Sequence, residues 1–187
     1  HAIYEFGSEE QKDFYLPVMA KGDKLGCFGL TEADAGSDPA SMKTKAIEKD
    51  GGYVLNGSKN WITNSPIADV LIIWAKDEQE ILRGFIVDRD SKGLSTPKID
   101  GKFALRASTT GQIFLEDVFV PKDKMLPNVQ SFRGPFSCLN MARYGIAWGA
   151  MGAAEFCWEA SLNYSLERVQ FGLSLIHISE PTRLHGI

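Results

Sequence analysis

Histidine is scarce in this chain of 187 residues, and its scarcity excludes whole classes of catalytic site. The sequence contains His1, His177 and His185, so no histidine lies between residues 2 and 176. Hydrolases with a Ser-His-Asp or Cys-His arrangement need an imidazole beside the nucleophile, and many metal sites need one as a ligand. The main body therefore carries neither kind of site. We expect no metal there, and we expect its chemistry to use a reactive group from outside the chain.

Cysteine is equally scarce, and long hydrophobic runs are missing. Cys27, Cys138 and Cys157 are odd in number and far apart, which favours a reducing compartment over a disulfide framework. The longest apolar stretch, from Tyr144 to Ala154, has about half of the roughly 20 residues that a membrane span needs. No apolar segment follows a basic start, so no signal peptide is visible. We expect a protein without a membrane span.

An excess of positive charge is also missing. There are 20 Lys and Arg residues against 24 Asp and Glu residues, which gives a formal net charge of −4. Both signs are interspersed, so no basic face is available to bind nucleic acid or an anionic membrane. The apolar content of 44% is instead typical of a folded globular protein.

The first 24 residues predict a helical region. Ser8 and Gln11 have the spacing of a capping box, and apolar side chains then recur at roughly helical intervals. We expect Pro17 to break or restart this helix, and Gly22 suits its C-terminal cap.

Between residues 25 and 120 the pattern changes to short β-branched and aromatic runs, such as residues 69–75 and 112–120. Turn signals stand at Asp50-Gly51-Gly52 and at Asn56-Gly57. Short strands at this spacing are typical of an antiparallel sheet, barrel or sandwich.

From Pro135 to about Gln170 the sequence predicts one helix of about 35 residues, some 50 Å long. Gly145, Gly149 and Gly152 would each cost about 1 kcal/mol relative to alanine in an isolated helix. We therefore expect another helix or a ligand to approach closely there.

One loop, GLTEADAGSDPASM from Gly29 to Met42, consists mainly of small and hydroxylated residues. It also carries the carboxylates of Glu32, Asp34 and Asp38. A phosphate-binding loop needs bare amides and a cation, so this loop does not fit that class. It suits a ligand with a polar edge.

Three segments have the order and spacing of one known family. They read CFGLTEADAGSD from Cys27, KNWITNSP from Lys59, and RYGIAWG with LERVQFG from Arg143 onward. Together they resemble the acyl-CoA dehydrogenase family. The wording GCFGLTE, WITNSPIAD, LRASTTG and CLNMARYGIAWG is similar to its glutaryl-CoA dehydrogenase branch. The resemblance covers residues 1 to about 172.

The resemblance implies an α+β fold, in which a central antiparallel β-barrel or sandwich domain lies between helical segments, and FAD as the cofactor. Residues 1–24 would end an N-terminal helical domain, residues 25–128 would form the β-domain, and residues 129–172 would start a C-terminal helical bundle. Residues 173–187 depart from the family pattern and show no helical apolar period. We expect foreign sequence there.

Site residues follow from the same resemblance. The loop's polar atoms would meet the flavin's pyrimidine edge, the Trp61 ring would stack on it, and the Thr63 hydroxyl would lie near the nitrogen that receives the hydride. The implied cofactor-binding positions are Phe28, Gly29, Leu30, Thr31, Glu32, Gly36, Ser37, Trp61, Ile62 and Thr63, with Arg168 and Phe171 contacting the FAD of a neighbouring subunit. The implied acyl-CoA positions are Ser37, Phe136, Leu139, Asn140 and Arg143.

Each assignment has a plainer alternative. The loop is also compatible with a surface turn, Trp61 with a core tryptophan, Arg143 with a surface ion pair, and Arg168 with a charge that offsets the helix dipole. Trp61 and Thr63 lie two residues apart in a predicted strand, so both side chains leave the same face. That shared face favours ligand contact over the core alternative for Trp61.

The resemblance implies oxidative decarboxylation of glutaryl-CoA to crotonyl-CoA, in lysine and tryptophan degradation. Another acyl-CoA specificity, or a non-catalytic β-sandwich binding module, is the alternative. The family's general base, a Glu in a YEGT-like motif, lies downstream of these residues. We therefore assign no catalytic residue and expect the chain as given to be inactive. Family members typically form homotetramers and pass electrons to an electron-transfer flavoprotein, in the bacterial cytoplasm or the mitochondrial matrix.

Overall fold

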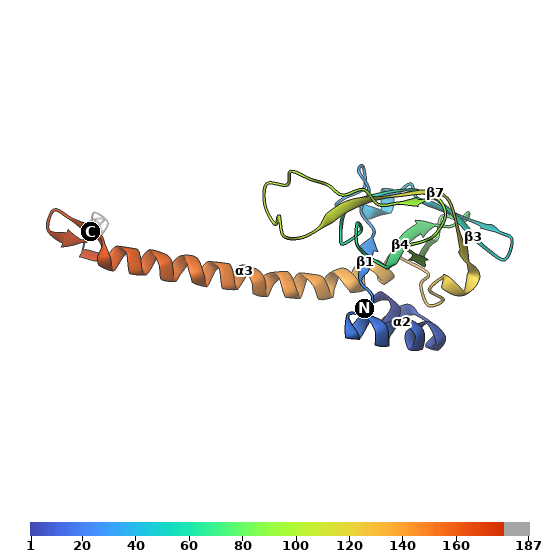
Figure 1. Ribbon diagram of the computed structural model, residues 1–187, viewed down its shortest axis with the longest axis horizontal. Helices are drawn as coiled ribbons and strands as arrows, with labels where there is room; N and C mark the ends of the chain where they lie inside the picture. Colours follow the sequence, from blue (N-terminus) through green and yellow to red (C-terminus); the bar gives the residue numbers. More distant parts are fainter. Residues whose placement is uncertain (178–187) are drawn as a thin grey trace, which may run out of the picture. The chain divides into compact units, whose positions relative to one another are not determined.

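The computed structural model describes residues 1–177, which form a sheet-rich unit of residues 1–138 and a second unit that starts at residue 139 (Figure 1). The helices are α1 (Ala2–Phe6), α2 (Glu9–Lys21) and α3 (Arg133–Glu167), with short 3₁₀ helices η1 (Pro39–Ser41), η2 (Lys122–Lys124) and η3 (Leu175–His177). The strands are β1 (Gly26–Gly29), β2 (Lys45–Lys49), β3 (Gly52–Thr63), β4 (Val70–Lys76), β5 (Leu82–Asp88), β6 (Leu94–Ser95), β7 (Thr110–Pro121), β8 (Val169–Gln170) and β9 (Leu173–Ser174).

Helix α2 begins and ends where the sequence predicts. Ser8 Oγ accepts from the Gln11 amide at 3.2 Å, the Gln11 side chain accepts from the Ser8 amide at 3.0 Å, and Gly22 closes the helix with a φ of 82°. The expectation that Pro17 interrupts the helix is wrong, because α2 runs through it. Two caps and the buried side chain of Tyr15 stabilise the helix enough to offset the lost backbone hydrogen bond.

Gln11 also joins α2 to the far end of the β-domain. Its side-chain amide donates to the carbonyls of Asp123, at 2.6 Å, and Met125, at 3.0 Å. The Asn128 amide donates to Phe6 O at 3.3 Å. These bonds hold the segment that enters the β-domain beside the segment that leaves it.

The β-domain is confirmed, with one difference in strand direction. The sheet order is β1-β4-β2-β3-β7-β6, and β5 pairs with β4. Most pairs are antiparallel, but β1 and β2 both run parallel to β4, so the sheet is mixed. The reason lies in the connections, since the long loop after β1 and the β2–β3 hairpin return the chain to β4 in the direction of β1.

Of the two predicted turns, one is confirmed and one is wrong. Asp50 and Gly51 have φ values of 51° and 79° and form the two-residue turn between β2 and β3. Asn56-Gly57 lies inside β3, at a shift in the pairing with β7. A Cβ on Gly57 would lie 2.5 Å from Thr44 Oγ1, so glycine is needed here for close approach within a β-bulge.

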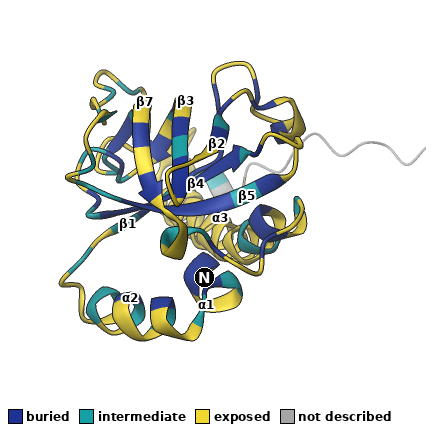
Figure 2. Cartoon of the chain, turned by 90° about the vertical axis from the view of Figure 1, so that its right-hand side faces the viewer, coloured by how far each residue is buried: buried dark blue, intermediate teal, exposed yellow. Residues whose placement is uncertain are grey.

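The core lies along β4 and its neighbours (Figure 2). Strand β4 is buried from Val70 to Ala75, which is the near-continuous pattern of a strand covered on both faces. The largest fully buried apolar side chains are Trp74, Phe85, Leu55, Leu71 and Ile73. The face of α2 that is turned away from the sheet is exposed (Figure 2).

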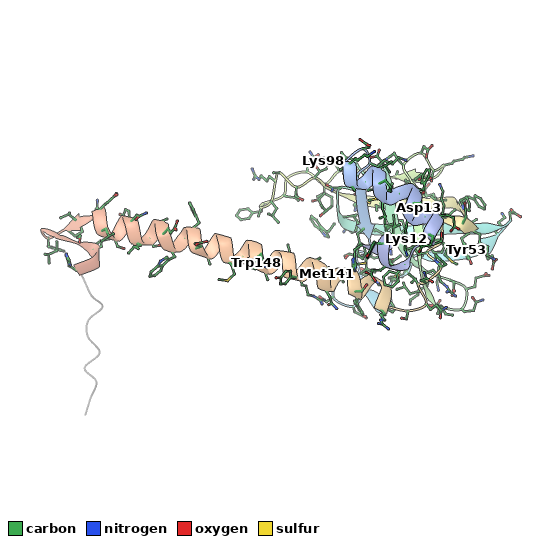
Figure 3. All side chains as sticks on the ribbon, turned by 90° about the horizontal axis from the view of Figure 1, so that it is seen from below. Lys12, Asp13, Tyr53, Lys98, Met141 and Trp148 are labelled. Atoms are coloured by element: carbon green, nitrogen blue, oxygen red, sulfur yellow. The ribbon has the colours of Figure 1, made fainter. Side chains whose placement is uncertain are left out.

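The predicted long helix is confirmed as α3, starting two residues earlier than expected. Gly134 lets the helix start against the buried Trp74 ring, where a Cβ would lie 3.1 Å from the ring. In the second unit the side chains of α3 are largely exposed, and Met141 and Trp148 stand clear of the helix (Figure 3). Within residues 1–177 a Cβ placed on Gly145, Gly149 or Gly152 would meet no atom within 4 Å beyond its chain neighbours and the nearby backbone of α3, so close packing there stays a prediction.

No helix among the described residues is long and apolar enough to cross a membrane. Beyond α3, Phe171 and Gly172 have φ values of 54° and 76° and connect β8 to β9. Residues 178–187, most of the segment predicted to be foreign, lie outside the described residues.

Candidate functional site

The loop after β1 is fixed against β3 by its backbone. The Asn60 amide donates to Thr31 O at 2.9 Å, and Glu32 and Ala35 bond each other's backbone in a tight bridge. Thr31 is half-buried, while Gly36 and Ser37 are exposed. The structure therefore brings two predicted segments together, the loop of residues 28–37 and the strand end at residues 61–63.

Glu32, which is among the predicted cofactor contacts, turns its carboxylate into the protein. Its Oε1 accepts from the Thr44 amide at 3.0 Å, from Thr44 Oγ1 at 2.5 Å and from Lys59 Nζ at 2.8 Å. Its Oε2 accepts from the Lys43 amide at 2.7 Å. Both side-chain oxygens are therefore engaged within the fold, so a cofactor contact of Glu32, which stays a prediction, would be made through its backbone.

Lys59 is the buried partner of Glu32, and its side chain has no exposed surface. Its ammonium also donates to Leu30 O at 3.2 Å. Burial lowers the pKa of Lys59 to about 8, an effect that the bond to Glu32 partly opposes. For Glu32, burial alone would raise the pKa, but the Lys43 amide and the Lys59 ammonium hold it below its ordinary value.

Trp61 is an exposed aromatic residue on a strained backbone. Its φ is 59°, a conformation rare for a bulky side chain, and it lies in the register shift between Lys59 and Ile62. The residue is 59% exposed, so the alternative of a core tryptophan is excluded, and Ile62 fills the core position at 4%. Thr63 is exposed like Trp61, in agreement with the predicted shared face.

Three residues of these segments carry a hydroxyl. Ser37 and Thr63 are exposed and Thr31 is half-buried, so their hydroxyls are accessible to a ligand. Accessible hydroxyls beside an exposed indole fit a planar ligand that has a polar edge and apolar faces. The residues present at this place therefore fit a flavin ring.

The predicted acyl-CoA residues are distributed over both units. Phe136 belongs to the first unit, is 39% exposed and packs against Phe132 with ring centroids 5.8 Å apart. In the second unit, Asn140 and Arg143 are exposed, and Arg143 Nη1 donates to Asn140 Oδ1 at 2.6 Å. No carboxylate of the described chain pairs with Arg143, so the surface ion pair is not seen.

The other predicted positions are placed as follows. Phe28 is half-buried beside the Trp74 ring, whereas Gly29 and Leu30 are buried, so they face a ligand through their backbone at most. Leu139 on α3 is half-buried. Arg168 and Phe171, beyond α3, are exposed, and Phe171 is exposed completely.

A groove of about 1040 Å³ lies elsewhere in the first unit, between α2 and the strands. Its walls carry charges of both signs, including Lys24, Asp88 and Lys124, and none of the predicted site residues. The groove is lined by residues of α2, including Phe14 and Tyr15, and is separate from the loop of residues 28–37 and the strand end at residues 61–63. Within residues 1–177 no cluster of His, Cys, Asp or Glu could hold a metal.

Sequence reasoning missed Lys59 and Thr44. A lysine in a strand is normally a solvent-facing residue, and its acidic partner lies 27 positions earlier in the chain. The available signal was Lys59 within KNWITNSP together with the unexplained acid of the ligand loop, Glu32. Their pairing required the fold.

Comparison with known proteins gives a consistent result. The family model for the acyl-CoA dehydrogenase middle domain matches residues 27–118. A short-chain specific acyl-CoA dehydrogenase of Clostridium acetobutylicum is 39% identical over 178 residues, which cover 92% of this chain and 47% of that protein. A short/branched chain specific acyl-CoA dehydrogenase of Rattus norvegicus is 40% identical, over 89% of this chain and 39% of that protein.

Solved structures similar to this chain are also acyl-CoA dehydrogenases. A glutaryl-CoA dehydrogenase of Mycobacterium smegmatis is 47% identical with a TM-score of 0.90, over 93% of this chain and 45% of that one. An acyl-CoA dehydrogenase complexed with FAD from Bacillus anthracis is 41% identical with a TM-score of 0.86, over 93% and 30%. The chain spans about half the length, or less, of the relatives that it matches. On fold and sequence together, the chain belongs to the acyl-CoA dehydrogenase family, which depends on FAD.

Proposed function

We propose that this chain supplies the flavin-contacting surface, and part of the acyl-CoA surface, of an acyl-CoA dehydrogenase of the glutaryl-CoA type. Trp61 is the observation that carries the proposal. Its indole is 59% exposed on a backbone with a φ of 59°. Because the side chain is not buried in the core, core packing does not compensate for that backbone strain. A planar ring that stacks on the indole supplies a reason for both features.

The residues around Trp61 have separate roles toward FAD. The Thr31 hydroxyl and the backbone of residues 28–30 would bind the polar edge of the ring, Trp61 would stack on it, and the Thr63 hydroxyl would donate to the nitrogen that receives the hydride. Bound FAD supplies the redox chemistry, as the acceptor of the hydride from the β-carbon of the acyl thioester. The chain contributes orientation and excludes water from the ring.

Toward the acyl-CoA, Arg143 supplies the positive charge. Its guanidinium is exposed and bonds a neutral partner, Asn140, so its charge is free for the phosphates of CoA. Phe136 and Leu139 offer apolar surface to the chain of the ester, and Ser37 lies on the exposed part of the flavin loop.

Glutaryl-CoA is the proposed substrate, with carbon dioxide and crotonyl-CoA as products. Two glutaryl-CoA dehydrogenase structures from Mycobacterium smegmatis support it, at 44% and 47% identity. The short-chain and short/branched-chain relatives are 39% and 40% identical, so a substrate with another acyl group is the alternative. Arg168 and Phe171, exposed beyond α3, support a contact with the FAD of a second copy in a tetramer.

Electron-transfer flavoprotein is the proposed electron acceptor, in the cytoplasm of a bacterium or the mitochondrial matrix of a eukaryote. The relatives include bacterial proteins and mitochondrial ones from Solanum tuberosum and Rattus norvegicus. The source of the chain decides between the two compartments.

Titration with FAD tests the flavin surface. We expect the chain to quench flavin fluorescence and the Trp61→Ala variant to do so less, because ring stacking is lost. Equal quenching by both proteins would contradict the proposed site.

Exchange of residues 1–172 into two host enzymes tests the substrate. In the Mycobacterium smegmatis glutaryl-CoA dehydrogenase, the ratio of kcat/KM for glutaryl-CoA over butyryl-CoA should stay at the host's value. In the Clostridium acetobutylicum enzyme, the exchange should lower kcat/KM for butyryl-CoA. The opposite pattern would favour the short-chain alternative.

A further inference from the structure

Three successive loop residues are held by two successive residues of β3. Lys59 Nζ donates to Leu30 O at 3.2 Å, the Asn60 amide donates to Thr31 O at 2.9 Å, and Lys59 Nζ reaches the Glu32 carboxylate at 2.8 Å. The next residue along β3 is Trp61. The position of the loop relative to the exposed indole therefore depends on Lys59.

Glu32 extends the same connection to the other end of the loop. Its two carboxylate oxygens accept from the amides of Lys43 and Thr44, just before β2 begins at Lys45. Thr44 is fully buried and lies against Gly57, in the bulge of β3. One buried carboxylate thus joins both ends of the loop to the strand that carries Trp61.

We propose that the buried Lys59–Glu32 pair is a positioning device for the cofactor, which fixes the Thr31 loop in register with Trp61 and Thr63. The proposal rests on the proposed flavin site. Hydrophobic residues can fill such a place in a core with equal or better stability, so stability alone does not explain an ion pair there. A charged donor aimed at the Leu30 carbonyl does explain it, because charge-assisted hydrogen bonds are directional and strong.

The test uses the double variant Lys59→Met/Glu32→Gln, which removes both charges and leaves neither one buried alone. Lys43→Met is the matched control, because Lys43 pairs with Asp34 on the same loop with both side chains about four-fifths exposed. Three properties of each protein are measured: the thermal midpoint, amide hydrogen exchange of the unliganded chain, and FAD affinity from flavin fluorescence together with the absorption spectrum of the bound flavin.

We expect the double variant to keep a cooperative transition, to exchange the amides of residues 30–35 at least tenfold faster, to bind FAD about tenfold more weakly or worse, and to shift the bound-flavin spectrum. Lys43→Met should leave all of these at wild-type values. Wild-type exchange and affinity in the double variant would overturn the proposal.

A double variant that does not fold is replaced by Lys59→Met alone, in which Glu32 still accepts from the amides of Lys43 and Thr44 and from Thr44 Oγ1. It should speed exchange at residues 30–31 more than at residues 43–44, and equal exchange at both places would refute the positioning role. If the wild-type chain binds no FAD, the flavin function fails, whereas the exchange result still decides whether the pair positions the loop.

Discussion

Replacing Lys59 with methionine should change how the stability of the protein depends on pH. In the folded chain, burial lowers the pKa of Lys59 from 10.5 to about 8. Between those values the unfolded chain binds more protons than the folded one, so the contribution of Lys59 to the free energy of unfolding rises with pH. Below pH 8 both states hold the proton, and the buried charge is a constant cost.

The size of the effect follows from the same two values. A shift from 10.5 to about 8 corresponds to roughly 3 kcal/mol at about 1.36 kcal/mol per unit. Glu32 stays out of this range, because its pKa is held below the ordinary value and its contribution is lost only as the pH falls through the acid range. Other titrating groups are present in both proteins and cancel in the difference.

Urea unfolding of the wild type and of Lys59→Met, in unit steps from about pH 7 to 10, measures this difference. The wild type should gain stability relative to the variant above pH 8, by up to roughly 3 kcal/mol. The exposed-lysine variant Lys43→Met should show no such trend. A difference that stays flat or falls with pH would refute the argument, and would mean that attraction to Glu32 outweighs burial.

Three further changes test other parts of the structure. In the Mycobacterium smegmatis enzyme that carries residues 1–172 of this chain, Trp61→Ala should weaken FAD binding by about 1–3 kcal/mol through lost stacking. Unchanged flavin content after dialysis of that variant would contradict this. In that same enzyme, Thr63→Val should slow reduction of the flavin by substrate more than it weakens ester binding, which single-turnover bleaching and a binding titration separate. Gly57→Ala should destabilise the β-domain by about 1–3 kcal/mol, because its Cβ would lie 2.5 Å from Thr44 Oγ1; an unchanged urea midpoint would show that the bulge adjusts freely.

Local signals in the sequence predicted local structure well. The capping box at Ser8, the turn at Asp50-Gly51 and the helix that became α3 each depend on neighbours within a few positions, and each is confirmed. The expected break at Pro17 is wrong because its cost of about 3 kcal/mol is offset by the two caps of α2, by the burial of Tyr15 and by the Gln11 bonds to residues more than 100 positions away. The predicted turn at Asn56-Gly57 is wrong because the same residue types occur in turns and in β-bulges.

In the candidate site, too, the features set by neighbouring residues were predicted and those set by distant contacts were not. The spacing of Trp61 and Thr63 predicted that both side chains leave one face of a strand, since strand alternation is a local rule. The positive φ of Trp61 is not local, because it follows from the register shift against β7. The inward turn of Glu32 depends on Lys59, on another element, and sequence spacing carries no information on that pairing.

The hydrogen bonds from the Gln11 side chain to the carbonyls of Asp123 and Met125 have a consequence for how the gene can evolve. Because residues 6–11 bond residues 123–128, the segment between them, which contains α2 and the sheet, begins and ends at nearly one point in space. A segment whose two ends meet can be inserted into a helical protein, or exchanged between paralogues, without displacing the helices on either side. The sheet and α2 can therefore diverge together as one inserted segment.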